Sequence, residues 1–169
     1  SDERYRPIVG KLCEIPVGPK EHRRLIPIIT DEYPDPDFGS GAVKITGAHD
    51  FNDYQVARRN KIPLYRLMNA VAAMRDDGEP YAECAARAAE IVRTGELPGE
   101  AEVDAINLVP DEYRGLDRYE ARKRIVAAID EEGLAVTVND AEGNAVPYVE
   151  QKKIMQPFGD RSGVVIEPM

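Results

Sequence analysis

The chain has 169 residues, of which 43% are hydrophobic and 31% are charged. This composition is typical of a soluble globular domain that needs no disulfide or metal to hold its core. Its net charge of −9 argues against a general nucleic-acid-binding surface, because phosphate contact depends on Lys and Arg. The charge is compatible with a local pocket that binds a few terminal nucleotides.

The cell compartment is indicated by what the sequence lacks. Residues 1–7 (SDERYRP) carry no apolar signal-peptide core, and no apolar run approaches the roughly 18 residues of a membrane helix. Cys13 and Cys84 have no CxxC spacing and no accompanying His cluster, so we interpret them as idle or buried thiols in a reducing compartment. The sequence predicts a cytoplasmic protein without a membrane partner.

The first third of the chain has the alternation of short strands. Residues 10–17 (GKLCEIPV) and 23–33 (RRLIPIITDEY) alternate and carry branched side chains, with a turn between them. Prolines and glycines punctuate residues 33–41, which we predict to be a loop. Residues 42–46 (AVKIT) then form a further predicted strand.

The stretch GSGAVKITGAHDFNDY (39–54) brings charged and polar residues to one predicted corner. Lys44 and Thr46 share one face of the strand. Asp50 is the predicted N-cap of the helix that follows, and Asp53 lies three residues further on, so both carboxylates can face one pocket. The corner would suit a ligand with an ammonium group and a hydroxyl, such as threonine.

Two other interpretations of the corner stay open. Asp50 and Asp53 can be only the capped start of a helix, where the dipole favours carboxylates, with Lys44 a solvated strand residue and His49 a turn residue. A catalytic zinc site is not expected, because it needs three ligands and the chain has only His22 and His49 as histidines. Magnesium held by the two carboxylates is an alternative that no other residue supports.

The middle of the chain is predicted to be helical. Residues 79–99 are alanine-rich, begin with Pro80 in the first turn and reach a glycine stop at Gly95. Residues 116–133 place apolar side chains near one face and stop at Gly133.

Strands are predicted to resume at 134–139 and 146–155, and a last short strand at 163–168 closes the chain. The mixture predicts an α+β fold: a single domain over 1–169 in which a strand-built body carries a helical insertion at approximately 66–133.

Several segments resemble one family. FGSGAVKITGAHDFNDY (38–54) resembles the editing-domain signature of valyl-tRNA synthetases, which has related forms in the isoleucyl and leucyl enzymes. PFGDRSGVVIEPM (157–169) resembles the segment by which that domain returns to the synthetase body, and residues 23–41 and 116–134 also resemble this family. The resemblance is weakest around 69–105. HDFNDY and GDRSGVVIEPM point to the valyl enzymes in particular.

This resemblance implies a β-barrel-like editing domain from a class I aminoacyl-tRNA synthetase, the valine–tRNA ligase. The implied activity is post-transfer editing, the hydrolysis of threonine wrongly esterified to the valine tRNA. An apolar pocket cannot strongly reject threonine, whereas a second site that hydrogen-bonds the hydroxyl rejects valine because valine would leave buried polar groups unpaired. The implied partners are the tRNA acceptor 3′ end carrying threonine and the rest of the parent synthetase.

Carried over position by position, the resemblance makes Asp53 the residue that holds the substrate α-ammonium. No side chain is an obvious general base, so the implied mechanism uses a positioned water assisted by the free ribose hydroxyl of the terminal adenosine. The assigned catalytic residues are Asp53 and Lys44, and the assigned substrate-binding residues are Asp50, Thr46, Phe38 and His49.

Editing is expected to need no cofactor and no metal. ATP and magnesium would serve the parent ligase outside this segment, because the chain lacks the HIGH-type and KMSKS-type signatures.

Two departures from the family pattern matter. Gly47 stands where the family usually has proline, which we expect to loosen the corner. A Thr/Arg-rich segment of the TTRPET kind, which normally completes the pocket near the domain's start, is not in the sequence. We therefore expect an N-terminally truncated editing domain. The alternatives are a folded but inactive fragment that binds the tRNA 3′ end, and an unrelated acidic binding domain.

Overall fold

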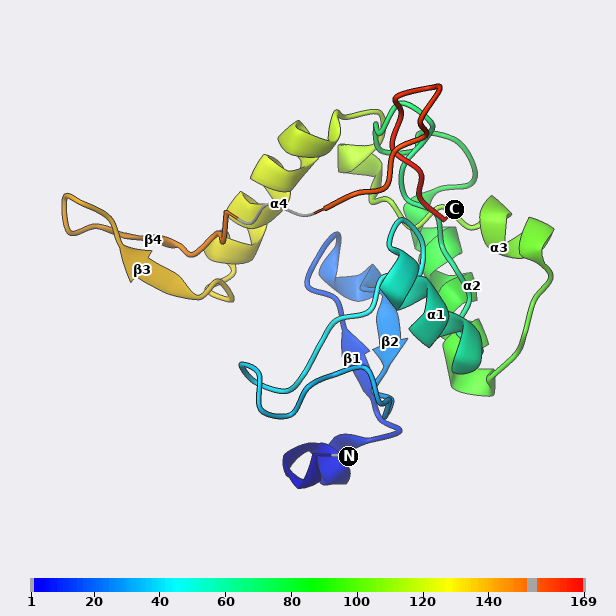
Figure 1. The fold of residues 1–169 in the computed structure, drawn as a ribbon, viewed down its shortest axis with the longest axis horizontal. Helices are drawn as coiled ribbons and strands as arrows, with labels where there is room; N and C mark the ends of the chain where they lie inside the picture. Colours follow the sequence, from blue (N-terminus) through cyan, green and yellow to red (C-terminus); the bar gives the residue numbers. More distant parts are fainter. Residues whose placement is uncertain (1, 152–154, 169) are drawn as a thin grey trace.

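A computed structural model describes residues 2–151 and 155–168. Four α-helices and two short hairpins make up most of its regular structure (Figure 1). The α-helices are α1 (Phe51–Arg59), α2 (Tyr81–Thr94), α3 (Glu100–Ala105) and α4 (Arg118–Glu131). The strands are β1 (Leu12–Glu14), β2 (Leu25–Pro27), β3 (Thr137–Asn139) and β4 (Ala145–Pro147), and the 3-10 helices are η1 (Glu3–Ile8), η2 (Lys20–His22) and η3 (Asp111–Tyr113).

Each hairpin is an antiparallel pair whose strands are shorter than predicted. β1 pairs with β2 in a register that places Cys13 opposite Ile26. β3 pairs with β4 around Val138 and Val146, and part of the predicted strand 146–155 lies outside the described residues. Within the described ranges neither sheet closes into a barrel. The α+β class is confirmed, and the barrel-like form is not seen in the described residues.

Two predicted strands are wrong. Residues 42–46 belong to no sheet, and the backbone N–H of Thr46 donates to the Asp53 carboxylate at 2.7 Å instead of to a neighbouring strand. Residues 163–168 form only one isolated bridge, between Phe158 and Val165. An alternating pattern is realised as a strand only where a second strand supplies the backbone partners.

The three long predicted helices are confirmed because local signals define their ends. The Asp50 carboxylate accepts hydrogen bonds from two backbone N–H groups at the start of α1, which is the role of an N-cap. α2 ends at Gly95, whose φ of +70° is the left-handed conformation that glycine adopts without steric cost. Gly133 follows α4 with a φ of +69°.

The hydrophobic core lies in the helical part of the chain. Its buried cluster joins α2, α3 and the segments beside them, with Ile91 and Leu108 among its most enclosed side chains. The side chains of β1 and β3 are exposed. Three-residue strands present too little apolar area to form a core, so the Ala-rich face of α2 takes that role.

A polar network fixes the helical part internally. Asn107 is fully buried, and its amide donates to the backbone carbonyls of Asp77 and Arg75 while its oxygen accepts from the N–H of Val109. The Arg75 guanidinium is 2% exposed and pairs with the Asp77 carboxylate at 2.6 Å. Buried polar groups need such partners, so this network specifies how the loops around α2 pack.

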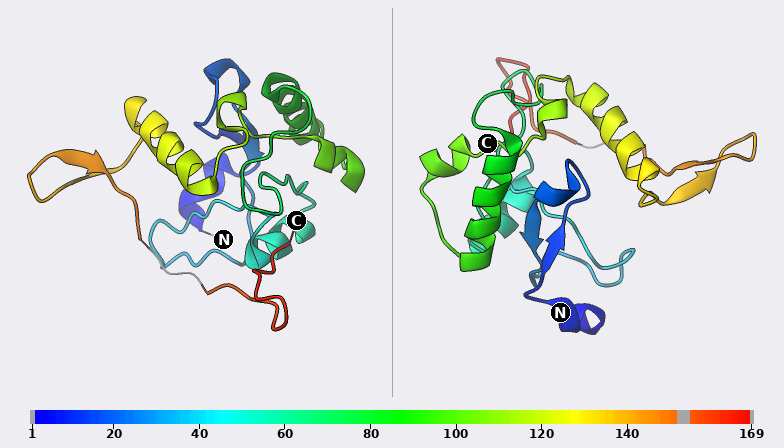
Figure 2. Two further views of the ribbon diagram at one scale, coloured as in Figure 1. Left: turned by 90° about the horizontal axis from the view of Figure 1, so that it is seen from above. Right: turned by 180° about the vertical axis from the view of Figure 1, so that it is seen from behind.

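In Figure 1, α1 lies to the right of the centre, on the same side as α2 and α3. The β3–β4 hairpin extends away from the body beyond α4, and the two views of Figure 2 show the same arm from other sides. The C-terminal segment returns to the start of α1, where the His49 N–H donates to the Pro168 carbonyl at 2.7 Å.

Candidate functional site

The candidate site is the corner where residues 42–46 meet the start of α1. The Asp50 side chain is engaged in capping: its Oδ1 accepts from the N–H of Asn52 at 2.8 Å and of Asp53 at 3.0 Å. That cap fixes the first turn of α1 and directs Asp53 back toward Thr46. The structure thus supports the capping interpretation of Asp50.

Asp53, Thr46 and Lys44 come together as the spacing predicts. Asp53 Oδ2 accepts from the Thr46 N–H at 2.7 Å, and the Lys44 ammonium donates to the Thr46 hydroxyl. Among the described residues, Asp53 Oδ1 accepts no hydrogen bond, so one oxygen of this partly buried carboxylate is available to a ligand.

Each charged group of this trio has a pKa shifted toward its neutral form. Burial raises the pKa of Asp53 and the nearby Asp50 carboxylate adds to that rise, while the Thr46 N–H and Lys44 oppose it. Burial also lowers the pKa of Lys44, with Asp53 opposing that fall and Arg24 adding to it. A carboxylate whose charged form is disfavoured in this way gains from an added cation, and a ligand ammonium is such a cation.

Gly47 closes the corner tightly. A Cβ built at Gly47 would lie 2.5 Å from Leu64 Cδ2 and 2.7 Å from the Ala57 Cβ, closer than real Cβ contacts allow. The absence of a side chain therefore lets residues 46–48 approach α1, and the expectation that Gly47 loosens the corner is wrong. The departure from the family's proline goes with close packing.

His49 joins three segments. Its side chain is 10% exposed, its Nε2 accepts from the Leu67 N–H at 3.4 Å, and its Nδ1 lies 3.3 Å from Glu167 Oε1 without forming a hydrogen bond. Its φ of +71° lies in the left-handed region. These contacts give His49 a structural role between the loop at 67 and the C-terminal segment, and its predicted contact with substrate stays a prediction.

Phe38 is not brought to the corner. Its side chain is 76% exposed on the loop 33–41, which extends away from the start of α1 in Figure 1. Tyr5 and Arg4 of η1 donate to the carbonyls of Ser40 and Pro36 and hold this loop from the N-terminal side. The predicted contact of Phe38 with the terminal adenosine would require the ligand to reach this loop.

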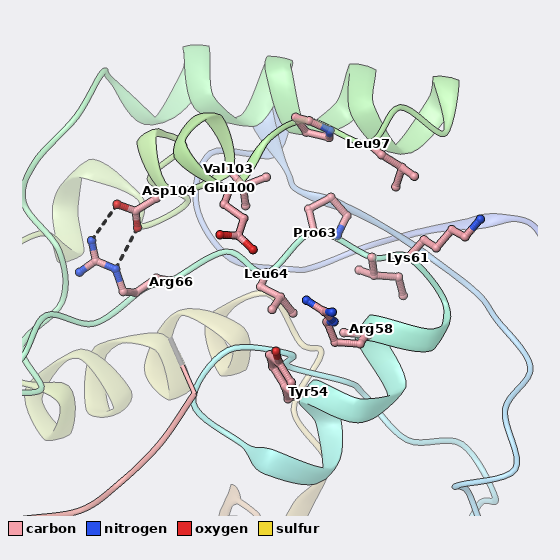
Figure 3. A pocket seen from close by; sticks show the side chains of 13 residues that line it. Tyr54, Arg58, Lys61, Pro63, Leu64, Arg66, Leu97, Glu100, Val103 and Asp104 are labelled. Atoms are coloured by element: carbon pink, nitrogen blue, oxygen red, sulfur yellow. Dashed lines mark hydrogen bonds and ion pairs between the residues drawn. The ribbon is translucent and has the colours of Figure 1, made fainter.

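A pocket of about 530 Å³ lies beside the corner, between the end of α1 and α3 (Figure 3). α1 ends at Arg59, and Lys61, with a φ of +55°, turns the chain so that Pro63 and Leu64 reach the pocket beside α3. Arg58 and Glu100 line the same pocket. It shares the Ala57 and Leu64 side chains with the packing of Gly47, and its lining includes none of the six residues predicted for the site.

One charged residue at the corner was missed by the sequence analysis. The Arg24 guanidinium lies over the Tyr65 ring at 4.9 Å from its centroid, and its charge contributes to the lowered pKa of Lys44. The only local signal is the Arg23–Arg24 pair at the start of an apolar strand. Spacing cannot reveal a contact with a ring 41 residues further on.

Residues 2–151 and 155–168 hold neither a cluster of metal-ligating side chains nor a membrane-spanning helix. In those ranges no group of three or more His, Cys, Asp or Glu side chains is placed to hold a metal ion. None of the helices described there has the length and apolar character needed to cross a membrane.

The fold and site define an α+β domain with a tightly packed corner, where Lys44, Thr46 and the partly buried Asp53 meet. Over an alignment of 184 residues that covers 100% of the chain, the sequence is 65% identical to a valine–tRNA ligase of Ruegeria pomeroyi. The chain spans 18% of that relative's length. No family model matches the chain. The similarity supports a segment of a valyl-tRNA synthetase, and therefore a larger parent enzyme.

Proposed function

We propose that this chain is the editing segment of a valyl-tRNA synthetase and hydrolyses threonine esterified to the valine tRNA. One observation carries the proposal. In a chain that is similar throughout to part of a valine–tRNA ligase, Asp53 presents a partly buried carboxylate with one unoccupied oxygen next to the Lys44–Thr46 pair.

Substrate binding follows from these three side chains. The threonine α-ammonium binds Asp53, because a cation offsets the desolvation that raises the pKa of this carboxylate. The threonine hydroxyl binds the polar pair formed by Lys44 and Thr46. Valine lacks that hydroxyl and forms no hydrogen bond with the pair, which disfavours valine relative to threonine at this site.

Hydrolysis requires water to attack the ester carbonyl while the ribose oxygen of the terminal adenosine leaves. In this scheme the free oxygen of Asp53 binds the ammonium and Asp50 caps α1, so neither is assigned the role of general base. The ribose hydroxyl next to the ester orients the water, and binding at Asp53 and Lys44 fixes the ester in reach of it. No cofactor enters this scheme, and ATP and magnesium serve the parent ligase elsewhere.

A second candidate is a segment that binds the tRNA 3′ end without catalysis of its own. Exposed apolar side chains favour it: Val136 is 74% exposed beside β3, and Phe158 is 61% exposed in the C-terminal segment. Such side chains fit contacts with other parts of a synthetase. In this case hydrolysis would need a Thr/Arg-rich segment supplied by the parent.

The test is deacylation of Thr-tRNA(Val) against Val-tRNA(Val) by this chain, by its Asp53→Asn variant and by Asp130→Asn. Asp130 is an exposed helical aspartate in α4, so its variant reproduces the charge change away from the corner. Selective hydrolysis of the threonine ester that is lost only in Asp53→Asn supports the first candidate. Binding of the tRNA end by folded protein without hydrolysis supports the second, and neither binding nor hydrolysis contradicts both.

A further inference from the structure

The pocket between α1 and α3 carries one charged side chain of each sign on opposite walls. Its volume of about 530 Å³ lies within the range of small-molecule sites, which are mostly apolar with a few placed polar groups. Arg58 projects into it from the last turn of α1, and Glu100 projects into it from the first turn of α3 (Figure 3). Within residues 2–151 and 155–168 neither side chain forms an ion pair.

The other charged residues of the pocket do not complete these two groups. Arg66 and Asp104 pair with each other through two hydrogen bonds of 3.0 and 3.3 Å, and Arg75 lies 3.5 Å from the same carboxylate. The Lys61 side chain points away from the other lining residues in Figure 3. A cation and a carboxylate are therefore left facing each other across the pocket.

Apolar surface lies between the two charged groups. The Arg58 guanidinium is 5.8 Å from the centroid of the Tyr54 ring, so a cation–π contact holds it against α1. Pro63, Leu64 and Leu97 line the pocket as well, and Leu97 is 60% exposed. Covering this apolar area is favourable. A matching ligand therefore has a ring, an anionic group for the guanidinium and a hydrogen-bond donor for the carboxylate.

We propose that this pocket binds a nucleotide whose base carries an exocyclic amino group. The phosphate binds Arg58, because a guanidinium makes charge-assisted, often bidentate, contacts with phosphate. The amino group of the base donates to Glu100, which is how carboxylates bind the amino group of cytosine. In a nucleotide the two groups lie on opposite sides of the ring system, as the two charges do in the pocket. A free amino acid carries its two charges on one carbon and does not match.

The inference rests on the proposed function, which supplies the nucleotide. Arg58 follows Asp53 by five residues on α1, which is about 7.5 Å along the helix axis. The Ala57 and Leu64 side chains line the pocket and also meet Gly47 of the corner. With the terminal adenosine at the corner, the nucleotide that precedes it along the tRNA strand reaches the pocket. A free mononucleotide has the same chemistry, and the experiments distinguish it.

The direct test follows the backbone amide signals of Arg58, Glu100 and Val103 by NMR in the full chain. Cytidine, adenosine and uridine monophosphates and inorganic phosphate are titrated separately at constant ionic strength. The cytidine and adenosine compounds should bind about 5-fold or more tightly than uridine monophosphate, because uracil presents a carbonyl oxygen to the carboxylate. No shift with any nucleotide, or equal binding of all three nucleotides, overturns the inference. Equal binding of inorganic phosphate and the nucleotides does so too.

Variants then assign the two contacts. Glu100→Gln should remove the preference for amino-bearing bases, because the Gln amide both donates and accepts. Arg58→Gln should weaken binding of all three nucleotides about 10-fold or more, because a charge-assisted contact is lost. The controls are Glu83→Gln, also an exposed acid in the first turn of a helix, and Arg122→Gln on the exposed side of α4. Equal effects in a variant and its control would contradict the site.

Deacylation kinetics identify the source of the nucleotide and separate the two proposals. A raised KM for Thr-tRNA(Val) in Arg58→Gln, with kcat unchanged, supports the tRNA strand as the occupant. An unchanged KM in a variant that has lost mononucleotide binding contradicts the tRNA strand and assigns the pocket to a free nucleotide. If mononucleotides bind as expected and Thr-tRNA(Val) is not hydrolysed, the nucleotide site stands and the editing activity is wrong.

Discussion

Replacing Asp53 with Asn separates the charge of this residue from its shape. The Asn side-chain oxygen can still accept the hydrogen bond that the Thr46 N–H donates at 2.7 Å, so the contact between residue 46 and α1 is kept. What disappears is the negative charge and the second carboxylate oxygen, which among the described residues accepts no hydrogen bond. The change therefore tests ammonium binding with little disturbance of the corner.

The size of the loss follows from the contact that the ligand would make. A hydrogen bond to a charged group contributes about 1.5–3 kcal/mol. Since about 1.4 kcal/mol corresponds to a factor of ten, kcat/KM for the threonine ester should fall roughly 10- to 150-fold. The loss should appear for any ligand with an α-ammonium, and it should be absent for an analogue in which that group is replaced by hydrogen.

Stability should move in the other direction. The pKa of Asp53 in the folded protein is raised, mainly by burial, so the folded state binds a proton more readily than the unfolded chain does. The resulting stabilisation is present below the unfolded pKa of about 3.8 and is lost as pH rises through the folded value. At pH 7 the ionised carboxylate thus opposes folding, and Asp53→Asn should unfold at the same or a higher temperature.

The assay combines deacylation kinetics with thermal unfolding at pH 7, using Asp130→Asn as the control in both. Lower activity with equal or greater stability is the expected pair of results. If Asp53→Asn loses both activity and stability, the carboxylate is a structural group and the assignment of ammonium binding is wrong. Unchanged kcat/KM would contradict the assignment as directly.

Three further changes test the packing around the site by denaturant unfolding. Gly47→Ala places a Cβ 2.7 Å from the Ala57 Cβ and should lower the free energy of unfolding by about 1–3 kcal/mol. In the control Gly99→Ala the new Cβ meets nothing within 4 Å, so this change should be nearly neutral. Equal effects of the two changes would contradict the tight packing at Gly47. Arg75 lowers the pKa of Asp77 to about 2 from 3.8, so the stability from this pair is present above about pH 4 and is lost as pH falls toward 2. In Asp77→Asn the free energy of unfolding should therefore fall less between pH 4 and pH 2. A pH dependence equal to that of the unchanged protein would contradict this prediction. Asn107→Leu removes three hydrogen bonds from a fully buried position and should cost about 2–4 kcal/mol; unchanged stability would show that the network is dispensable.

The parts of the fold that the sequence predicts are those with local causes. Asp50 caps α1, Gly95 ends α2 and Gly133 follows α4, as their positions in the sequence indicate. Each of these signals acts within one helical turn, so no knowledge of the rest of the fold is needed.

The failures involve distant partners. Residues 42–46 alternate like a strand, but the Thr46 N–H is taken by a side chain of α1, and alternation alone cannot identify the partner of a backbone group. The sequence predicts a strand-built body and does not locate the core. The core formed around α2, where small side chains such as Ala88 allow α3 and its neighbours to pack closely.

In the candidate site too, the contacts between residues close in sequence were predictable and the tertiary contacts were not. Lys44, Thr46 and Asp53 lie within ten residues of one another, and their spacing predicts their contact correctly. Arg24 approaches them only because β2 brings it to Tyr65, which is a tertiary contact. Such a residue can be recognised in a structure by its missing counter-charge, but a sequence shows it only as one more arginine.

The free protein keeps charges of both signs in partly desolvated positions at one corner. Asp53 and Lys44 partly offset each other, as their opposing effects on each other's pKa show, while Arg24 has no described carboxylate of its own. A ligand ammonium beside Asp53 would offset the desolvation that raises the pKa of this carboxylate.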